Sequence, residues 1–366
     1  MTTLQIENAP GGTLEDKLSR LDEVLGGLGR VGLGRVLIGY SGGVDSALLM
    51  VAAHRVLGDD AIAVTADSES YAEGELELAV EIAGRFGVRH EIVRTRELDN
   101  PDYASNPVNR CYFCKTELFE HMEDLARRLQ ADNILYGHNV DDVGDFRPGA
   151  TAAREHGVRA PLQEAGFTKA DVRELAKRWD IPVWNRPAMA CLSSRFPYGT
   201  PVTSEGLRRV DRAEKLVRAQ GFGSHVRVRH HDDVARIELP ADDLERLLGD
   251  ADIRARLATG LVELGYSRVT ADLRGFRSGS LNEVLKKQDA DEAGGTVTEV
   301  AGGVIAAAAR LGLGLAESGE AQQITWVRLR DAAAARLADE RLRGDLVAAA
   351  EAVGGRYVAL DLIPLD

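Results

Sequence analysis

Short apolar runs alternate with amphipathic stretches over roughly the first half of the chain. Runs rich in apolar and β-branched residues, which predict strands, occupy residues 35–40, 61–66, 90–94 and 133–137. Helical periodicity follows them over residues 47–55, 72–86 and 114–129. Strands that alternate with helices build parallel sheets covered on both faces, so the pattern predicts a doubly wound α/β domain over residues 1–200.

The later residues show a different pattern. Residues 203–218 predict a helix, and residues 225–230 and 234–239 alternate as a hairpin, so we expect a smaller α+β domain over residues 201–285. Residues 286–295 are polar and glycine-rich and predict a linker. Helices over 304–311 and 331–353 and strands over 323–329 and 357–363 then make residues 286–366 a C-terminal α/β extension. Its sequence suggests only packing or oligomerisation.

The most specific motif directly follows the first predicted strand. It reads Ser-Gly-Gly-Val-Asp-Ser and contributes the candidate nucleotide-binding residues Ser41, Gly42, Gly43, Asp45 and Ser46. Adjacent glycines let the backbone approach a ligand closely, and the start of the following helix attracts anions. The six letters match the PP-loop signature of enzymes that split ATP between the α- and β-phosphates. A plain glycine turn with a helix cap is the alternative.

Further polar residues follow the later strands, where ligands of open α/β sheets bind. Asp67 and Ser68 follow the second strand, and Gly137, His138 and Asn139 with Asp141, Asp142 and Asp145 follow the later one. We expect them to gather near the PP-loop, although capping and turn formation would also explain them. Asp45 and Asp142 are candidate Mg²⁺ ligands, because Mg²⁺ prefers one or two carboxylates together with phosphate oxygens.

The chain has three cysteines, Cys111, Cys114 and Cys191. A Cys-x-x-Cys pair in a cytoplasmic protein is more often a metal or redox element than a disulfide. No obvious fourth ligand completes a zinc site, whereas three thiolates suit an iron–sulfur cluster with one open iron. For Cys111 and Cys114 the alternative is two partly buried thiols. Arg186 and Arg195 flank Cys191 and favour its thiolate as a nucleophile or ligand.

The predicted hairpin contains a candidate phosphate site. Strand alternation places Arg227 and Arg229 on one face, where two guanidiniums suit a phosphate. The alternative is a solvated strand face with cross-strand pairing to Glu238.

Composition limits the partners. The net charge of −13 argues against a broad nucleic-acid-binding surface. No apolar run approaches the roughly 18 residues of a membrane span, and the N-terminus lacks the pattern of a signal peptide. We therefore expect a cytoplasmic protein with neither a nucleic-acid nor a membrane partner.

Several separate segments together resemble the LarE family of sulfur transferases, which belongs to the ATP pyrophosphatase superfamily. They are the PP-loop and residues 109–119, 136–149, 187–200 and 274–283, and the resemblance covers about residues 15–285. It implies an adenine nucleotide alpha hydrolase-like fold. It also implies that ATP adenylates a carboxylate of pyridinium-3,5-biscarboxylic acid mononucleotide and that sulfur then displaces AMP. The thiocarboxylate product would serve synthesis of the nickel-pincer nucleotide cofactor of lactate racemase.

The resemblance also assigns roles to residues. In sacrificial members a cysteine matching Cys191 gives up its sulfur and becomes dehydroalanine. In members with three cysteines, matching Cys111, Cys114 and Cys191, the thiols hold a [4Fe-4S] cluster that carries an extra sulfide, and we favour this version because all three are present. A homo-oligomer is also expected. The implied substrate-binding residues are Ser194, Arg195, Glu214, Arg227, Arg229 and Glu238.

Two other classes of protein stay open at this point. One is a different PP-loop enzyme, either a tRNA thiolase or an amide-forming synthetase, but a tRNA thiolase would need a basic groove that this acidic chain does not indicate. The other is a non-catalytic nucleotide-binding or iron–sulfur carrier protein.

Overall fold

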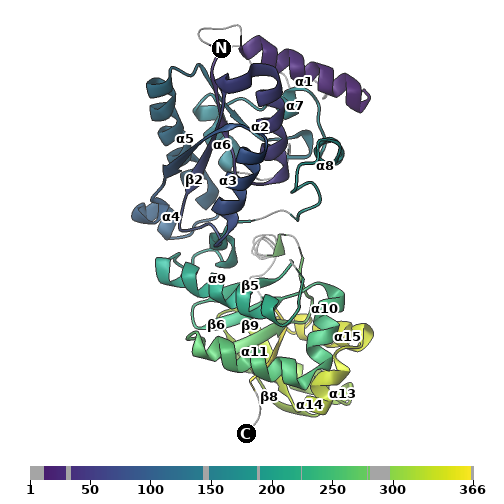
Figure 1. Ribbon diagram of the computed structural model, residues 1–366. Coiled ribbons are helices and arrows are strands. Elements are labelled where there is room, and N and C mark those ends of the chain that lie inside the picture. The colour runs from purple at the N-terminus through teal and green to yellow at the C-terminus, as the bar shows by residue number, and fades with distance from the viewer. Residues whose placement is uncertain are drawn as a thin grey trace. The chain divides into compact units, whose positions relative to one another are not determined.

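The structure is a computed structural model, and it describes residues 12–29, 34–142, 148–187, 190–223, 225–277, 279–280 and 297–363. The chain divides into two compact units, Met1–Cys191 and Leu192–Asp366, both drawn in Figure 1. None of the described helices is long and apolar enough to cross a membrane.

The first unit contains a four-stranded parallel sheet with the order β3-β2-β1-β4. Its strands are β1 (Val36–Gly39), β2 (Ala61–Asp67), β3 (Arg89–Arg94) and β4 (Asn133–Tyr136). Nearly every side chain of β1 and β2 is buried, as expected for a parallel sheet with helices on both faces. The predicted α/β fold class is confirmed.

Strand alternation sends side chains into two separate cores. Val36 and Ile38 pack with α1 (Leu14–Leu28), α2 (Val44–Leu57), α3 (Glu75–Arg85) and α8 (Lys169–Arg178). Leu37, between them, packs with α5 (Arg110–Leu129) and α6 (Pro148–Glu155) on the other face. Figure 1 shows α5 on one side of the sheet and α1 on the other. The remaining short helices are η1 (Gly58–Asp60), η2 (Glu97–Asp99), α4 (Pro101–Ala104), η3 (Val140–Asp142) and α7 (Pro161–Glu164).

Two helices of this unit begin earlier than predicted. Helix α2 starts at Val44, so Asp45 and Ser46 belong to its first turn. Helix α5 starts at Arg110, so both Cys111 and Cys114 lie near its N-terminus instead of only Cys114. These shifts place the candidate site residues Asp45, Ser46, Cys111 and Cys114 at helix starts.

The second unit contains a six-stranded mixed sheet with the order β5-β6-β7-β10-β9-β8. Strands β5 (Arg227–His231) and β6 (Val234–Glu238) form the predicted antiparallel hairpin, and β7 (Arg268–Asp272) pairs in parallel with β6. Strands β8 (Leu315–Ala321), β9 (Ile324–Leu329) and β10 (Ala359–Asp361) complete the sheet. The helices are η4 (Leu192–Arg195), α9 (Ser204–Ala219), α10 (Ala241–Gly249), α11 (Ala251–Glu263), α13 (Val297–Arg310), α14 (Asp331–Arg336) and α15 (Glu340–Glu351).

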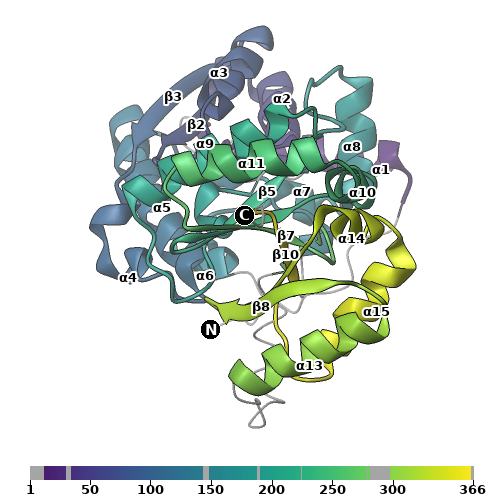
Figure 2. The same ribbon diagram turned by 90° about the horizontal axis from the view of Figure 1, so that it is seen from below.

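The C-terminal extension shares its sheet and core with the preceding residues. Strand β10 pairs antiparallel with β7, and Figure 2 shows these two strands next to one another. A continuous hydrophobic core joins α9 and α11 to α13 and α15. Residues 201–285 and the described part of 286–366 therefore lie in one compact unit, although the sequence pattern separated them. The predicted linker, residues 286–295, and Asp145 lie outside the described residues.

The long C-terminal helix predicted over residues 331–353 is two helices. Helix α14 ends at Arg336, and Asp339 begins the next one by accepting a hydrogen bond from the Leu342 backbone N at 2.8 Å. An aspartate at a helix start satisfies an amide that has no partner within the helix, which favours a new start here.

Candidate functional site

The PP-loop runs from the end of β1 into the first turn of α2. Gly42 has φ +74°, a backbone conformation that glycine adopts without strain. The Ser46 hydroxyl donates to Gly43 O at 3.0 Å and accepts from Ser41 N at 3.2 Å, which fixes the loop. Gly43 is the N-cap residue and supplies no side-chain cap, so the first turn of α2 can offer its amides to an anion.

Gly137 follows β4 and lies directly against the PP-loop. A Cβ built on Gly137 would lie 2.6 Å from Ser46 N and 2.9 Å from the carbonyl carbon of Asp45. Both atoms belong to the backbone, so no side-chain rotation relieves the contact. The close approach of β4 to the start of α2 therefore requires glycine at this position.

Asp45 has two side-chain partners from distant segments. Asn139 Nδ2 donates to Asp45 Oδ1 at 3.0 Å, and Lys169 Nζ forms an ion pair with Asp45 Oδ2. Asp142, the other candidate Mg²⁺ ligand, accepts a hydrogen bond from Asn139 N at 3.1 Å and so also stabilises its own turn. The sequence reasoning missed Lys169, because the lysine is 124 residues from Asp45 and no local motif marks it.

A pocket opens at the carboxyl ends of β2 and β3. Its volume is about 330 Å³. The Ser68 hydroxyl donates to Glu97 Oε2 at 3.1 Å and accepts from Ser70 N at 3.0 Å, so it is held within the wall. The pocket lies at the sheet edge where ligands of open α/β folds bind. Its lining residues are Asp67, Ser68, Glu69, Arg94, Thr95, Arg96, Glu97, Leu98 and Asp99.

The three cysteines gather in the first unit. Cys111 and Cys191 are exposed, and Cys114 is half-buried and donates from Sγ to Glu97 Oε1 at 3.7 Å. Burial, then Glu97, and after them the charges of Cys191 and Cys111 raise the pKa of Cys114. These effects indicate that the other two sulfurs lie within the range of charge interactions of Cys114.

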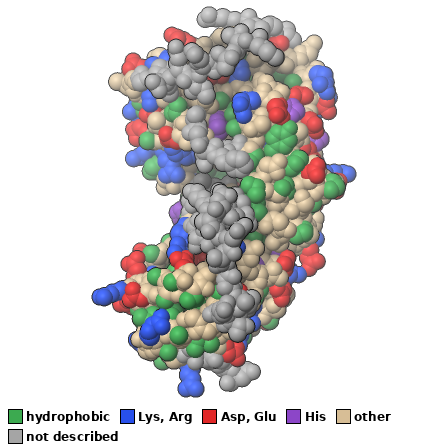
Figure 3. All heavy atoms as spheres, turned by 180° about the vertical axis from the view of Figure 1, so that it is seen from behind, with side chains coloured by type: hydrophobic (Ala, Val, Ile, Leu, Met, Phe, Trp, Pro, Cys, Tyr) green, Lys and Arg blue, Asp and Glu red, His purple; other side chains and the backbone are tan. Residues whose placement is uncertain are grey.

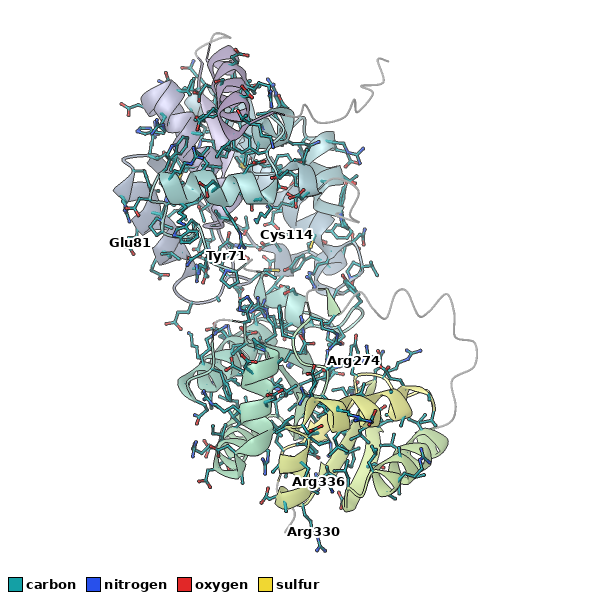
Figure 4. All side chains as sticks on the ribbon, turned by 90° about the vertical axis from the view of Figure 1, so that its right-hand side faces the viewer. Tyr71, Glu81, Cys114, Arg274, Arg330 and Arg336 are labelled. Atoms are coloured by element: carbon teal, nitrogen blue, oxygen red, sulfur yellow. The ribbon has the colours of Figure 1, made fainter. Side chains whose placement is uncertain are left out.

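Tyr71 stands beside the cysteines, and Figure 4 shows it close to Cys114. Burial is the largest effect that raises the pKa of Tyr71, followed by the charges of Cys114 and Cys191. The sequence reasoning missed Tyr71 and Glu97, since neither residue belongs to a recognisable motif. Among the described residues, no group of three or more His, Cys, Asp and Glu side chains is placed to hold a single metal ion.

The two arginines that flank Cys191 in sequence bind carboxylates. Arg186 pairs through two hydrogen bonds, of 2.7 and 2.9 Å, with Glu75. Arg195 pairs in the same way, at 2.8 and 3.0 Å, with Glu214. Both guanidiniums therefore have a carboxylate partner, and their effect on the Cys191 thiolate stays a prediction.

The second unit holds a buried group of arginines and carboxylates, which we call the arginine group: Ser194, Arg195, Glu214, Arg218, Arg227, Arg229 and Glu238. Glu214 and Glu238 are 1% and 0% exposed. Arg229 donates to Glu238 Oε2 at 2.9 and 2.6 Å and to Ser194 O at 2.8 Å. Cross-strand pairing of Arg229 with Glu238 thus occurs, but β5 and β6 are buried throughout and do not form the solvated face of that alternative.

Arg227 lies in a positive environment within the arginine group. Burial, and then the charges of Arg195, Arg229 and Arg218, lower its pKa to about 10, while Glu214 alone opposes them. A buried cation in such surroundings is stabilised by an added anion. The predicted substrate residues of this unit are therefore brought together in an arrangement suited to a phosphate.

The visible surface carries mixed charge. On the face drawn in Figure 3, Lys and Arg side chains are interspersed with Asp and Glu side chains and form no continuous basic field.

Comparison with known proteins finds several relatives of this chain. No protein-family model matches the chain. The chain is 45% identical over 274 residues to an uncharacterised protein of Synechocystis, an alignment that covers 75% of this chain and 100% of the relative. It is 39% identical over 257 residues to pyridinium-3,5-bisthiocarboxylic acid mononucleotide synthase of Lactiplantibacillus plantarum, covering 70% of this chain and 91% of that enzyme. A GMP synthase of Aeropyrum pernix is 29% identical over 213 residues, or 52% of this chain and 40% of that enzyme.

Proposed function

The chain belongs to the LarE family of ATP-dependent PP-loop sulfur transferases, and from this premise we propose that it makes pyridinium-3,5-bisthiocarboxylic acid mononucleotide for the nickel-pincer nucleotide cofactor. ATP adenylates each carboxylate of the biscarboxylic acid mononucleotide, with release of pyrophosphate. Sulfur then attacks the acyl carbon, and AMP leaves as the thiocarboxylate forms. The observation that carries the proposal is the 39% identity to the synthase over 91% of that enzyme's length.

The residues around the PP-loop support the ATP half of the reaction. The loop from Ser41 to Ser46 and the first amides of α2 would bind the phosphates. Gly137 lets the end of β4 pack directly against the backbone of this loop. Mg²⁺ would neutralise phosphate charge, and Asp45 and Asp142 are the candidate carboxylate ligands of this ion. Lys169 forms an ion pair with Asp45 here. We propose that its ammonium group turns to the departing pyrophosphate during the reaction and stabilises the negative charge there.

The cysteines support the sulfur half. Cys111 and Cys114 lie one turn apart on α5, and Cys191 approaches from another segment. A [4Fe-4S] cluster binds its cysteines at different irons, so they need not converge on one ion, which agrees with the lack of a single-ion site among the described residues. We propose that these three thiols hold the cluster, whose open iron supplies a site for exogenous sulfide.

The arginine group supports recognition of the substrate phosphate. Arg227 gains most from an added anion, because three arginines and only one carboxylate act on it. We propose that Arg227 binds the mononucleotide phosphate while the carboxylates of Glu214 and Glu238 hold Arg195 and Arg229 in place. The homo-oligomer and the Mg²⁺ requirement stay predictions.

A single experiment tests the activity and the source of sulfur. The protein is reconstituted anaerobically with iron and sulfide, and pyrophosphate release is measured with ATP, with and without the biscarboxylic acid mononucleotide. We expect the mononucleotide to accelerate release, and an unchanged rate would refute the proposed function. Nucleotide binding without any pyrophosphate release would indicate a carrier protein.

Mass spectrometry after turnover separates the two sulfur sources. With a cluster, Cys191 keeps its mass and the double variant Cys111→Ala/Cys114→Ala loses both iron and repeated turnover. Loss of H₂S from Cys191, together with full activity of that double variant, would instead establish sacrificial transfer.

A further inference from the structure

We propose that the C-terminal extension positions the arginine group through Tyr357, whose ring holds Arg236 against Glu238. The inference rests on the proposed function, since it concerns how the same substrate-binding residues are held. Tyr357 does not touch the substrate in this proposal. It acts through Arg236 and Glu238 on Arg229.

Arg236 occupies the centre of this arrangement. The side chain lies on β6, is 0% exposed, and pairs with Glu238 Oε1 at 3.1 Å and with Asp272. Its Nε donates to His231 Nε2 at 3.3 Å. Its Nη2 is buried without a hydrogen-bond partner among the described residues. A buried guanidinium that lacks one hydrogen bond depends on its remaining contacts for its position.

Tyr357 supplies one of those contacts from the extension. The Arg236 Cζ lies 3.9 Å from the centroid of the Tyr357 ring, where the negative face of the ring attracts a cation. The attraction is stronger than at a surface because Arg236 is desolvated. Tyr357 has φ +42°, which is rare for an aromatic residue and persists only where surrounding structure holds it. It packs against the small core of Val234, Ile324 and Ala359.

A second segment of the extension reaches the same arginine through His231. The hairpin turn between β8 and β9 contains Gln322 and Gln323, both with positive φ, where asparagine and glycine are the usual residues. His231 Nδ1 lies 3.0 Å from Gln322 O and must donate to it, because a carbonyl oxygen only accepts. Nε2 of the neutral ring is then left to accept from Arg236. Tyr357 therefore contacts Arg236 directly, and Gln322 contacts it through His231.

Glu238 connects Arg236 to the proposed substrate site. Its Oε1 forms an ion pair with Arg236 and accepts a hydrogen bond from Ser280 Oγ at 3.0 Å, and its Oε2 accepts both hydrogen bonds from Arg229. If Arg236 moves, Glu238 loses a charge partner on one oxygen and no longer holds Arg229 in one position. The network is fully buried, so water cannot replace the lost contact easily.

Part of this chain has no counterpart in one of its relatives. The alignment with the Synechocystis protein uses that relative's whole length but only 75% of this chain, so a quarter of this chain has no counterpart there. The resemblance to the family ends near residue 285. Tyr357 and Gln322 lie beyond residue 285, where that resemblance ends.

The test compares three variants of the full-length protein. Tyr357→Leu removes the ring, Tyr357→Phe keeps it, and Trp326→Leu removes another aromatic ring of the extension, which lies 3.8 Å from Arg268 Cζ. Arg268 pairs with Asp361 and has no contact with Glu238 among the described interactions, so Trp326→Leu reports general damage to the extension. Melting temperatures are measured for all three.

We expect Tyr357→Leu to raise the KM for the mononucleotide by about tenfold and to leave the KM for ATP unchanged. Tyr357→Phe should behave as the parent protein, and Trp326→Leu should lower the melting temperature without changing either KM. An unchanged KM for the mononucleotide in Tyr357→Leu would overturn the inference while the proposed function stands. Equal increases in KM in Tyr357→Leu and Trp326→Leu would also overturn it, because the effect would then be general destabilisation.

A separate titration keeps the inference testable if the parent protein shows no mononucleotide-stimulated release, a result that would refute the proposed function. Inorganic phosphate is titrated calorimetrically into the parent protein and the three variants. The inference predicts weaker phosphate binding in Tyr357→Leu alone. Equal phosphate affinities, or no phosphate binding by the parent protein, would refute it.

Discussion

Replacing Gly137 by alanine should displace the PP-loop without removing any hydrogen-bonding group. The added Cβ would lie 2.6 Å from Ser46 N, whereas an ordinary contact begins at 3.4 Å, so the two backbones must separate by about 0.8 Å. Overpacking of this kind costs about 1–3 kcal/mol of folding free energy. A displacement near 1 Å at a phosphate-binding loop costs up to about a hundredfold in rate.

The assay is pyrophosphate release from ATP in the presence of the mononucleotide, with urea unfolding of the same preparations. Gly84→Ala is the matched control, because Gly84 lies in α3 and a Cβ there meets nothing within 4 Å. We expect Gly84→Ala to keep the parent rate and to gain up to about 1 kcal/mol of stability. Gly137→Ala should lose at least about tenfold in kcat/KM for ATP while still folded. Parent kinetics in Gly137→Ala would refute the close contact between β4 and the PP-loop.

Three further predictions concern other parts of the molecule. Lys169→Met should lower kcat for pyrophosphate release by at least about tenfold, with much of the rate kept in Lys169→Arg, because a positive charge beside Asp45 is then retained; equal losses would contradict a charge role. Arg227→Gln should raise the KM for the mononucleotide yet raise the substrate-free melting temperature by about 2 °C, since it removes a buried cation from a positive environment; a lower melting temperature would count against it. Burial lowers the pKa of His230 from 6.5 to about 4. Between these two pH values His230 is therefore protonated in the unfolded chain and neutral in the folded chain. The free energy of unfolding should therefore fall as pH falls towards 4, by about 2 kcal/mol at pH 5, and His230→Gln should remove that part of the dependence in urea titrations.

Much of the first unit could be read from local pattern. The strands of a parallel sheet are short apolar runs, and glycine and helix signals punctuate them, so their positions emerged within about two residues. Strand order was not predictable, because β4 pairs with β1 across nearly a hundred residues. That all six strands of the second unit form one sheet was not predictable for the same reason. β10 pairs with β7 over a long separation in sequence, and local composition marked the intervening residues as a boundary.

The candidate site divides in the same manner. The PP-loop, the cysteines and the Arg-x-Arg strand each have a local signature, so sequence reasoning found them. Lys169, Glu97 and Tyr71 have none, and only folding brings them beside Asp45 and the cysteines. The carboxylate partners of Arg186 and Arg195 also have no local signature, because Glu75 and Glu214 are distant from them in sequence.

The sequence by itself determined the kinds of chemistry available: a phosphate-binding turn, three thiols and a pair of arginines, each encoded within a few consecutive residues. The tertiary structure decided which charges neutralise one another. Burial removes water as a partner, so each arginine and carboxylate must find its counterpart among side chains that are distant in sequence. That requirement pairs Arg229 with Glu238 and Arg195 with Glu214, and it sets Arg227 near Glu214 and three other arginines, where we propose that the substrate phosphate binds.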